Sequence, residues 1–362
     1  MNENYYCVIM AGGIGSRFWP LSKTSKPKQF LDILATGKSL LQETFNRFEK
    51  IFPTQNIYIV TNADYKKLTL EQLPQISPEQ VLLEPLRKNT APCIAYASYK
   101  IQKINPNAII VVAPSDHLIL KLNEFIDTIK KGLEFTSTQN ALLTLGVKPN
   151  RPETGYGYIQ INAEKNGFDN HLYKVKTFTE KPDIKLANVF FESGEFYWNS
   201  GIFIWSVSSI LDAFDNYLSE INSLFKSKYE LFNTKDEIKA IENIYSECKS
   251  ISIDYGVMEK ANNVFVLCSD FGWSDLGTWG SLYEHSKKDK DKNAINAKNI
   301  FVYNSKNCII NMPENKLVVL QGLDDYVIAE SDNVLLICKK EDEQEIKQYV
   351  NDVKRTKGDS YI

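Results

Sequence analysis

The sequence predicts an α/β fold with a mostly parallel mixed sheet, followed by a small β-rich region that ends in a helix. In the first half of the chain, short apolar runs typical of buried strands alternate with segments of helical spacing. This alternation predicts parallel strands with helices on both faces of the sheet. After residue 293, apolar triplets recur every eight or nine residues with polar turns between them, which predicts a β-roll or truncated β-helix.

The individual elements follow from local patterns of apolar residues. Helices are expected at 39–52 and 90–104, mainly helical chain at 207–249, and a last amphipathic helix at 341–354. Buried strands are expected at 7–11, 57–60, 81–83, 108–113 and 141–146, with a tight turn at 155–159 before the next strand. The C-terminal strands are expected to begin at Ile300, Cys308, Leu317, Tyr326 and Val334. We expect the last helix to pack on this roll or on another subunit.

Length and charge limit the class of protein. With 362 residues, the chain can bury a full core, and we expect a larger domain at 1–286 and a β-rich domain at 293–362. A linker rich in lysine and aspartate separates the two. The net charge of -3 and the pI near 5.8 argue against nucleic acid as a partner, because binding to phosphate backbones requires a basic face.

Cysteine spacing and hydropathy indicate the compartment. No window reaches the roughly 18 apolar residues of a membrane-spanning helix, and the N-terminal apolar run is too short for a signal peptide. The six cysteines form neither a C-x-x-C motif nor a Cys/His pair at metal-ligand spacing. We therefore expect reduced thiols, a cytoplasmic location and no membrane partner.

A glycine-rich loop directly follows the first predicted strand. Glycines lack a Cβ atom, so the backbone amides of such a loop can approach a phosphate closely. Prolines at 20 and 27 stiffen the loop, and its density of cations indicates a triphosphate ligand. The glycines are Gly12, Gly13 and Gly15, and the cations are Arg17, Lys23, Lys26 and Lys28.

Three other interpretations of this region fit less well. A dinucleotide-binding fingerprint that starts at Gly13 would require glycine at position 18, where the sequence has Phe18. Residues 36–39 imitate the end of a P-loop, but Asp32 occupies the position of its first glycine. An ordinary strand-to-helix turn explains the glycines but not the cations and prolines around them.

A segment after the third predicted strand, residues 84–92, contains an acid, an amide and a hydroxyl between prolines. Glu84 could accept hydrogen bonds from the N1 and N2 donors of guanine, which adenine does not offer. Asn89 and Thr90 are candidate nucleotide ligands, with the alternative that one of them only caps the following helix.

Two aspartates are candidate metal ligands. Asp116 follows the most apolar strand, next to Ser115, which we assign to the nucleotide site, and Asp275 lies between glycines and tryptophans. Mg²⁺ favours one or two carboxylates together with phosphate oxygens, so the pair predicts a magnesium site. The alternative for Asp116 is a helix cap or an ion pair with a nearby cation.

Aromatic and polar residues in the middle of the chain predict a sugar pocket. Glycines beside aromatic rings suit the close approach of a ring-shaped ligand, and amide or carboxylate groups can hold its hydroxyls. Lys181 would remain available for a phosphate on the sugar. We expect Trp205 to be a core residue. The sugar-pocket candidates are Gly157, Glu180, Asn199 and Gly201.

Eight ordered motifs resemble the bacterial type of mannose-1-phosphate guanylyltransferase, the GDP-mannose pyrophosphorylase family. They are AGGIGSRFWPLSKTSKPKQF, EPLRKNTAP, APSDH, ETGYGYI, FTEKP, WNSGIF, ISIDYGVMEK and WSDLGTW. The resemblance spans roughly residues 5–355 and departs from the family in Gly256, where alanine is more usual. It does not extend to the phosphomannose isomerase domain of many relatives, so no isomerase activity is expected.

The resemblance implies a Rossmann-like nucleotidyltransferase fold and a defined reaction. GTP and α-D-mannose 1-phosphate would give GDP-mannose and pyrophosphate by in-line attack on the α-phosphorus. Arg17 and Lys28 would hold the triphosphate, Lys181 the sugar phosphate, and Mg²⁺ on Asp116 and Asp275 would bridge the phosphates. Two alternatives stay open, namely another hexose 1-phosphate or nucleotide, and a non-catalytic nucleotide-sensing relative. We expect a homodimer.

Overall fold

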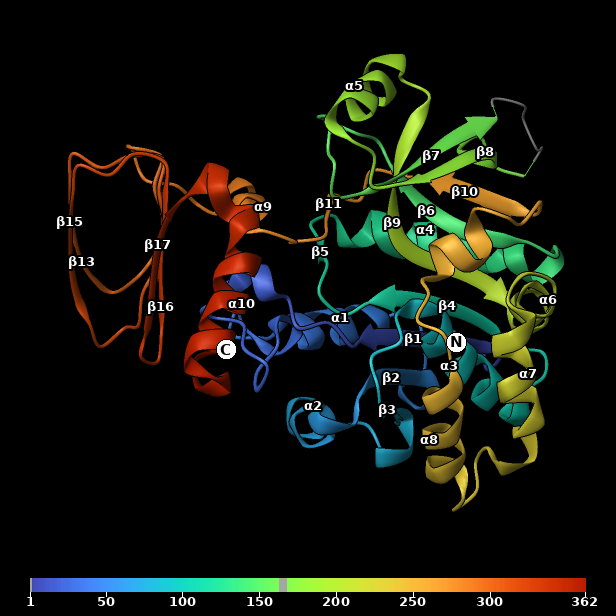
Figure 1. The fold of residues 1–362 in the computed structure, drawn as a ribbon. Helices are drawn as coiled ribbons and strands as arrows, with labels where there is room; N and C mark the ends of the chain where they lie inside the picture. Colours follow the sequence, from blue (N-terminus) through green and yellow to red (C-terminus); the bar gives the residue numbers. More distant parts are fainter. Residues whose placement is uncertain (1, 163–167) are drawn as a thin grey trace. The chain divides into compact units, whose positions relative to one another are not determined.

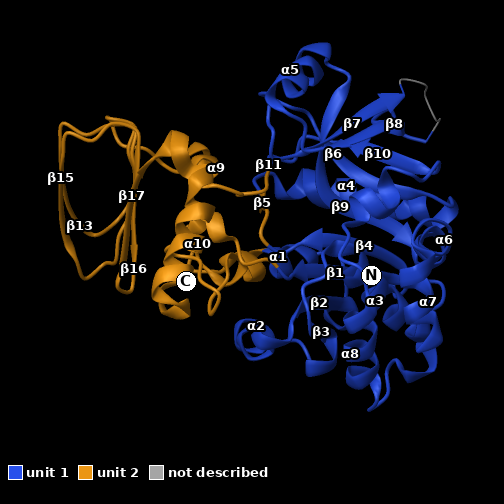
Figure 2. Ribbon diagram, in the orientation of Figure 1, with its two compact units in different colours: residues 1–12, 44–115, 119–273 blue, residues 13–43, 116–118, 274–362 orange. Residues whose placement is uncertain are grey.

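The computed structural model describes residues 2–162 and 168–362, which form two compact units. Unit 1 contains residues 1–12, 44–115 and 119–273, and unit 2 contains residues 13–43, 116–118 and 274–362 (Figure 2). The units are therefore interleaved along the sequence, and short segments at β5 (Leu118–Ile119) and β11 (Trp273–Ser274) lie where the chain passes between them. The domain boundary at 286–293 stays a prediction.

Unit 1 is built on one nine-stranded sheet with the order β3-β2-β1-β4-β9-β6-β10-β8-β7 (Figure 1). Strand β1 lies inside the sheet because its apolar side chains are buried on both faces, Val8 and Ile9 completely. The strands are β1 (Tyr5–Ala11), β2 (Ile57–Asn62), β3 (Val81–Glu84), β4 (Ile109–Pro114), β6 (Leu142–Val147), β7 (Gly157–Asn162), β8 (Leu172–Glu180), β9 (Phe196–Ser206) and β10 (Val264–Cys268).

The sheet is mixed, and its parallel part is the part in which strands and helices alternate. Strands β3, β2, β1 and β4 pair in parallel, as do β6 and β10. The rest of the sheet is antiparallel where a mostly parallel sheet was predicted. Strand β9 runs antiparallel to both β4 and β6, and β7 and β8 form an antiparallel pair. The apolar periodicity of β9 defines a buried strand but not its direction.

Helices cover the sheet of unit 1, and their ends follow capping chemistry. Asp183 and Ser206 accept backbone N–H groups at the starts of α5 and α6. Helix α3 occupies the predicted range 90–104 and shares a core with β1, β4 and α6–α8. The helices are α2 (Lys66–Gln72), α3 (Thr90–Ile104), α4 (Leu122–Thr138), α5 (Ile184–Ser193), α6 (Val207–Tyr217), α7 (Ser219–Ser227) and α8 (Glu237–Glu247), while α1 (Leu40–Phe48) runs from one unit into the other. None of the helices in the described part of the chain is long and apolar enough to cross a membrane.

Unit 2 contains the predicted β-roll. Parallel pairs join β12 to β14, β14 to β16 and β13 to β15, so that short strands stack around a small apolar interior at Cys308, Ile310 and Ile328. The predicted strand starts at 300, 308, 317, 326 and 334 fall at or within one residue of observed strands. The elements are β12 (Ala294–Asn296), β13 (Asn299–Tyr303), β14 (Ile309–Asn311), β15 (Leu317–Gln321), β16 (Tyr326–Ser331), β17 (Val334–Lys339), α9 (Trp279–His285) and α10 (Ile346–Lys357).

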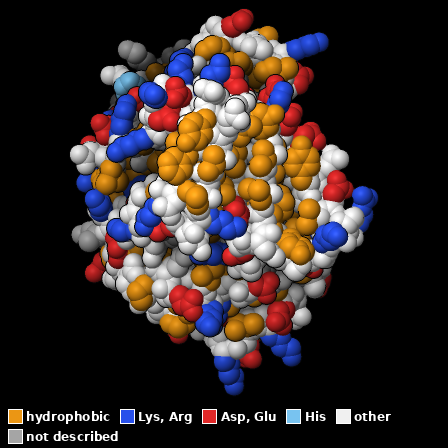
Figure 3. Space-filling view, turned by 90° about the vertical axis from the view of Figure 1, so that its left-hand side faces the viewer, with side chains coloured by type: hydrophobic (Ala, Val, Ile, Leu, Met, Phe, Trp, Pro, Cys, Tyr) orange, Lys and Arg blue, Asp and Glu red, His pale blue; other side chains and the backbone are white. Residues whose placement is uncertain are grey.

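The outer face of the β13–β15 pair is apolar. Side chains alternate along both strands, and Phe301, Tyr303, Leu317 and Val319 are each more than half exposed. Hydrophobic side chains gather on the face of the molecule shown in Figure 3. We call these four residues the roll face.

Helix α10 packs inside unit 2. Ile346 is fully buried in a cluster that also contains Phe18 and Trp19 of the glycine-rich loop and Val327 of the roll. The indole Nε1 of Trp19 donates to the backbone oxygen of Tyr361 at 2.8 Å. Of the two packing surfaces expected for the last helix, the roll is thus confirmed, and the glycine-rich loop is an additional one.

Candidate active site

The glycine-rich loop leaves β1 with two glycines that have different roles. Gly15 has a φ of 73°, and a Cβ atom on it would overlap with Cβ of Lys28, so only glycine fits. A Cβ atom on Gly13 would have no other heavy atom within 4 Å. Space beside Gly13 is therefore open, whereas Gly15 is required by the loop itself.

Lys28 is the best-buried cation of the loop. A 3₁₀ turn at Lys28–Phe30 positions it, and its backbone N–H donates to Ile14 O at 3.0 Å. The side chain is 3% exposed, and its Nζ donates to Asp116 Oδ2 at 2.8 Å and to the backbone oxygen of Asp275 at 2.9 Å. One ammonium group thus joins the two residues predicted to hold a metal.

The ion pair decides the charge state of Asp116. Burial alone would raise the pKa of this carboxyl, but the charges of Lys28 and His117 outweigh it and hold the pKa below its ordinary value. The carboxylate is therefore ionised at neutral pH. The structure therefore shows the alternative in which Asp116 forms an ion pair with a nearby cation.

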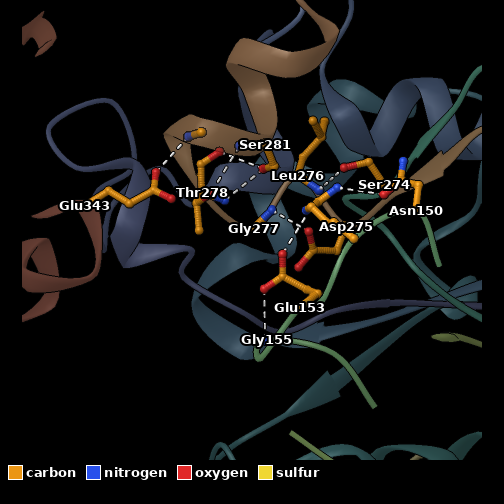
Figure 4. Close-up of polar contacts among 12 residues, drawn as sticks. Asn150, Glu153, Gly155, Ser274, Asp275, Leu276, Gly277, Thr278, Ser281 and Glu343 are labelled. Atoms are coloured by element: carbon orange, nitrogen blue, oxygen red, sulfur yellow. Dashed lines mark hydrogen bonds and ion pairs between the residues drawn. The ribbon is translucent and has the colours of Figure 1, made fainter. Parts of the chain in front are cut away.

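Asp275 is held in a tight turn before helix α9. Its Oδ1 accepts the backbone N–H of Gly277 at 2.8 Å, and Leu276 between them has a φ of 45° (Figure 4). The turn is anchored further on, where Thr278 caps α9 and Glu343 accepts the N–H of Gly280 at 2.7 Å. The Asp275 side chain is fixed in direction by this network.

The donor set around Lys28 suits a hard cation. A carboxylate oxygen of Asp116 and the backbone oxygen of Asp275 contact one buried positive charge, and Mg²⁺ favours oxygen ligands. Within the described ranges, no group of three acidic, histidine or cysteine side chains could hold a metal by itself. Phosphate oxygens would have to complete the coordination.

Arg17 has an unmet donor. Its Nε is buried and lacks a hydrogen-bond partner among the described residues. A buried guanidinium N–H without a partner costs free energy unless a ligand accepts from it. Arg17 is therefore suited to an anion.

Glu84 at the end of β3 is a buried carboxyl group. It is 6% exposed, and Tyr245 Oη donates to its Oε1 at 2.9 Å. Burial raises the pKa of Glu84 to about 7, although the hydrogen bond from Tyr245 acts in the opposite direction. A Cβ atom on Gly12 would lie 3.4 Å from Oε2, so the carboxyl group lies beside the first glycine of the loop.

Three further nucleotide-site candidates have structural partners. Asn89 Oδ1 accepts the N–H of Thr90 at 2.9 Å, which is the helix-cap alternative, and Thr90 Oγ1 accepts from Ile253 N at 2.8 Å. Ser115 is buried, and its backbone bonds to Met10 and Thr44. Each of the three residues thus has a structural partner, and its role as a nucleotide ligand stays a prediction.

The sugar-pocket candidates lie on adjacent strands of unit 1. Gly157 is paired with Glu180 across β7 and β8, and a Cβ atom on Gly157 would lie 2.5 Å from Glu180 Oε2 and 3.4 Å from Asn199 Cβ. Gly201 donates its N–H to Asn199 Oδ1 at 3.2 Å. Lys181 is exposed and forms an ion pair with the neighbouring Glu180.

The aromatic residues of this region divide into two groups. Trp205 is fully buried against Phe203, as predicted for a core residue. Trp198 packs against Tyr156 and Trp273, and its indole Nε1 is buried without a partner among the described residues.

Sequence reasoning missed two side chains that contact these groups. Tyr245 bonds Glu84, and Asp254 accepts from Asn199 at 2.9 Å. Asp254 lies inside the motif ISIDYGVMEK, so the signal was present, but nothing in the sequence connects it with a residue 55 positions earlier.

Residues 6–292 match the family described as nucleotidyl transferase, and residues 298–353 match a mannose-phosphate isomerase/GMP-like β-helix domain. A mannose-1-phosphate guanylyltransferase of Klebsiella pneumoniae is 35% identical over 98% of this chain and 75% of its own length. One of Escherichia coli shows the same identity and coverage. The chain belongs to the mannose-1-phosphate guanylyltransferase family.

Solved structures support the assignment to this guanylyltransferase family. A protein of Thermus thermophilus described as a mannose-1-phosphate geranyltransferase superposes with a TM-score of 0.85 at 27% identity, over 97% of this chain and 99% of its own. A Helicobacter pylori protein described as a mannose-6-phosphate isomerase superposes with a TM-score of 0.61 at 28% identity, over 75% of this chain and 99% of its own. The predicted nucleotidyltransferase fold with a C-terminal β-roll and terminal helix is confirmed.

Proposed function

We propose that this guanylyltransferase family member joins GTP and α-D-mannose 1-phosphate to form GDP-mannose and pyrophosphate. Family membership supports the reaction, and the contact of Lys28 with both Asp116 and Asp275 is the observation that supports chemistry on phosphates. A buried cation and two oxygen ligands are what a polyphosphate with its metal ion requires.

The phosphate nucleophile needs no general base. The sugar phosphate is already ionised at neutral pH, so one of its oxygens attacks the α-phosphorus, the bond to the bridging oxygen breaks, and pyrophosphate leaves. The task of the protein is to position two anions and to neutralise their charge. Arg17 and Lys28 bind the triphosphate, and Lys181 binds the sugar phosphate.

Magnesium fits the donor set at Asp116 and Asp275. These two residues would hold the ion, which acts as a Lewis acid on phosphate oxygens when bound. Lys28 contacts only Oδ2 of Asp116, so the other carboxylate oxygen would remain for the ion, and the ion pair keeps Asp116 ionised.

Base and sugar selection rest on unit 1. Glu84 as a carboxylate accepts from N1 and N2 of guanine beside Gly12, with Asn89, Thr90 and Ser115 near the same strand ends. Glu180, Asn199 and the backbone of Gly157 and Gly201 bind the sugar hydroxyls. Neutral Glu84 would lose one acceptor, so ionisation of this group controls the binding of guanine.

A substrate panel tests this proposal. The protein is incubated with Mg²⁺, each of the four nucleoside triphosphates and mannose, glucose or galactose 1-phosphate, and pyrophosphate release is measured. We expect the highest rate with GTP and mannose 1-phosphate. If another pair gave an equal or higher rate, that pair would be assigned as the substrates. If no pair released pyrophosphate, the result would favour a nucleotide-sensing protein.

We place the protein in the cytoplasm. All six cysteines are buried as free thiols, which agrees with a reducing compartment. Fractionation of the native host with a thiol-trapping reagent would test this location, because an exported protein would leave the cytosolic fraction.

A second copy of this chain is the partner that suits the roll face. Strands β13 and β15 carry outward positions 299, 301, 303, 317, 319 and 321, none of which is charged, and an uncharged apolar patch of this kind marks an interface. A symmetric dimer would cover both faces at once. Val319→Lys should yield a monomer in light scattering while the surface control Gln348→Lys stays dimeric. A monomeric wild type would refute the dimer.

A further inference from the structure

One partly buried carboxylate beside the sugar-pocket residues has no role in the proposed reaction. Asp254 begins a single π-helical turn, Asp254–Met258, that follows α8 in the sequence. Irregular turns of this type often occur at functional sites. Its Oδ1 accepts a hydrogen bond from Nδ2 of Asn199 at 2.9 Å.

The other end of the Asn199 amide is also held. Thr144 Oγ1 on β6 donates to Asn199 Oδ1 at 2.8 Å, and the backbone N–H of Gly201 donates to the same oxygen at 3.2 Å. Two donors therefore fix the amide oxygen, and one acceptor fixes the nitrogen. The amide orientation follows from this network, in which Asp254 is the acceptor.

Glu180 lies close to this network. A Cβ atom on Gly157 would touch both Glu180 Oε2 and Asn199 Cβ, so these two side chains converge beside the glycine. Burial, and next the charge of Glu180, raise the pKa of Asp254 to about 6, which is consistent with two carboxylates near one another. The ion pair of Lys181 with Glu180 offsets part of the cost of bringing these two acidic groups together, and a ligand or fixed polar group that uses them would offset more.

We propose that Asp254 is a positioning residue for the sugar: it turns the Asn199 amide so that the second Nδ2 hydrogen and the Glu180 carboxylate serve one hexose. The proposal rests on the function given above, in which Asn199 and Glu180 bind the sugar phosphate's ring hydroxyls. With this orientation, Asn199 donates to one hydroxyl oxygen while Glu180 accepts from another hydroxyl. The ligand class is a hexose 1-phosphate with neighbouring free hydroxyls.

Three variants separate the hydrogen bond from the charge. Asp254→Ala removes the acceptor and the charge, whereas Asp254→Asn removes the charge but keeps an oxygen that can accept from Asn199. Glu247→Gln is the matched control, because it neutralises an exposed carboxylate at the end of α8, a few residues before Asp254 in the sequence. All are assayed with varied sugar phosphate at saturating GTP, and with varied GTP at saturating sugar phosphate.

The expected result is a selective change in KM for the sugar. Asp254→Ala should raise KM for the hexose 1-phosphate about tenfold or more, as for loss of a hydrogen bond to a charged group. KM for GTP should stay within about twofold. Asp254→Asn should return the sugar KM to within about threefold of the wild type, and Glu247→Gln should match the wild type.

The readouts distinguish a positioning role from a structural one. In Asp254→Ala, the side-chain amide signal of Asn199 in a ¹⁵N spectrum should shift while the melting temperature stays within a few degrees. Equal increases in KM for both substrates, or an unshifted amide signal, would overturn the proposal. If Asp254→Ala unfolds, Asp254→Asn decides: a sugar KM as high as that of Asn199→Ala would also overturn it.

Failure of the proposed function looks different. If the wild type uses another hexose 1-phosphate or nucleotide, the same KM comparison is made with that pair, and the role of Asp254 is still tested. If the wild type transfers no nucleotide at all, binding of each hexose 1-phosphate is measured by calorimetry, and Asp254→Ala should weaken it about tenfold. Unchanged binding would then refute the proposal.

Discussion

At the scale of single residues, the burial of Glu84 would set the pH range of the proposed guanine site. A carboxyl group that accepts hydrogen bonds from guanine must be ionised, yet its burial favours the neutral form. The group titrates near neutral pH because desolvation, opposed by Tyr245, raises its pKa to about 7.

Binding of GTP should therefore strengthen as pH rises through 7. Since only the ionised form accepts both donors, the affinity at pH 8 should be about tenfold higher than at pH 6. Tyr245→Phe should move the midpoint to higher pH, because it removes a hydrogen bond that favours the carboxylate. Fluorescence titration with a GTP analogue checks both, and Glu84→Gln should bind with no such slope. A flat wild-type profile would rule out Glu84 as the guanine acceptor.

Lys28 is the loop cation whose loss should affect turnover most. Lys28→Ala removes a buried charge from the phosphates and leaves Asp116 without its partner, so kcat should fall roughly 10²-fold or more. Lys26→Ala is the control, because Lys26 is an exposed cation in the same loop. Steady-state pyrophosphate release measures both, and a kcat within twofold of the wild type for Lys28→Ala would contradict the assignment.

The residue types of this group could be predicted from the sequence, but their contacts could not. Glycines, cations and carboxylates at strand ends predicted phosphate and metal chemistry at Lys28, Asp116 and Asp275. The Lys28 ammonium group contacts both aspartates only because the fold brings together residues that lie 88 and 247 positions from Lys28 in the sequence. Tyr245 lacked a local pattern of this kind, and Asp254 lay in a motif that did not connect it with Asn199.

At the scale of elements, the glycine-rich loop separates two demands on glycine. Gly15 has a left-handed backbone and lies against the stem of Lys28, whereas Gly13 has open space around it. Gly15 supports the loop, whereas Gly13 leaves room for a ligand.

Alanine at the two positions should therefore have different effects. Gly15→Ala should lower the free energy of unfolding by about 1–3 kcal/mol because of backbone strain, and should disturb Lys28. Gly13→Ala should leave the melting temperature nearly unchanged but raise KM for GTP if backbone amides there bind phosphate. Calorimetry and kinetics on both variants check this, and a large loss of stability in Gly13→Ala would contradict it.

Local patterns predicted the elements better than their pairing. Helix α3 has the predicted bounds, because Asn89 caps it and the apolar spacing continues to residue 104. Strand β9 was not among the predicted strands, and its antiparallel place between β4 and β6 depends on long-range pairing. A period of two residues contains no information on strand direction.

At the scale of the whole molecule, unit 2 joins the beginning of the chain to its end. Phe18 and Trp19 follow the glycines, Leu276 follows Asp275, and all three share one apolar cluster with α10. Helix α10 thus supports the two loops whose residues we propose to bind phosphate and metal.

Ile346 tests this support. Ile346→Ala should cost about 2–5 kcal/mol of stability, because the side chain is fully buried, and should lower kcat although the residue contacts no substrate. Lys354→Ala on the exposed side of the same helix is the control. Thermal unfolding and kinetics below the transition measure both effects. A destabilised variant with unchanged kcat would show that the loops keep their positions without the helix.

The hydrogen bond from Trp19 to the oxygen of Tyr361 has a practical consequence for protein engineering. The backbone at Tyr361 accepts from the loop that carries Arg17, so a deletion that removes residues 359–361 would take away a contact of that loop. Enzymologists who shorten the chain for kinetic work should therefore keep these residues, because constants measured without them would describe a glycine-rich loop that has lost a contact.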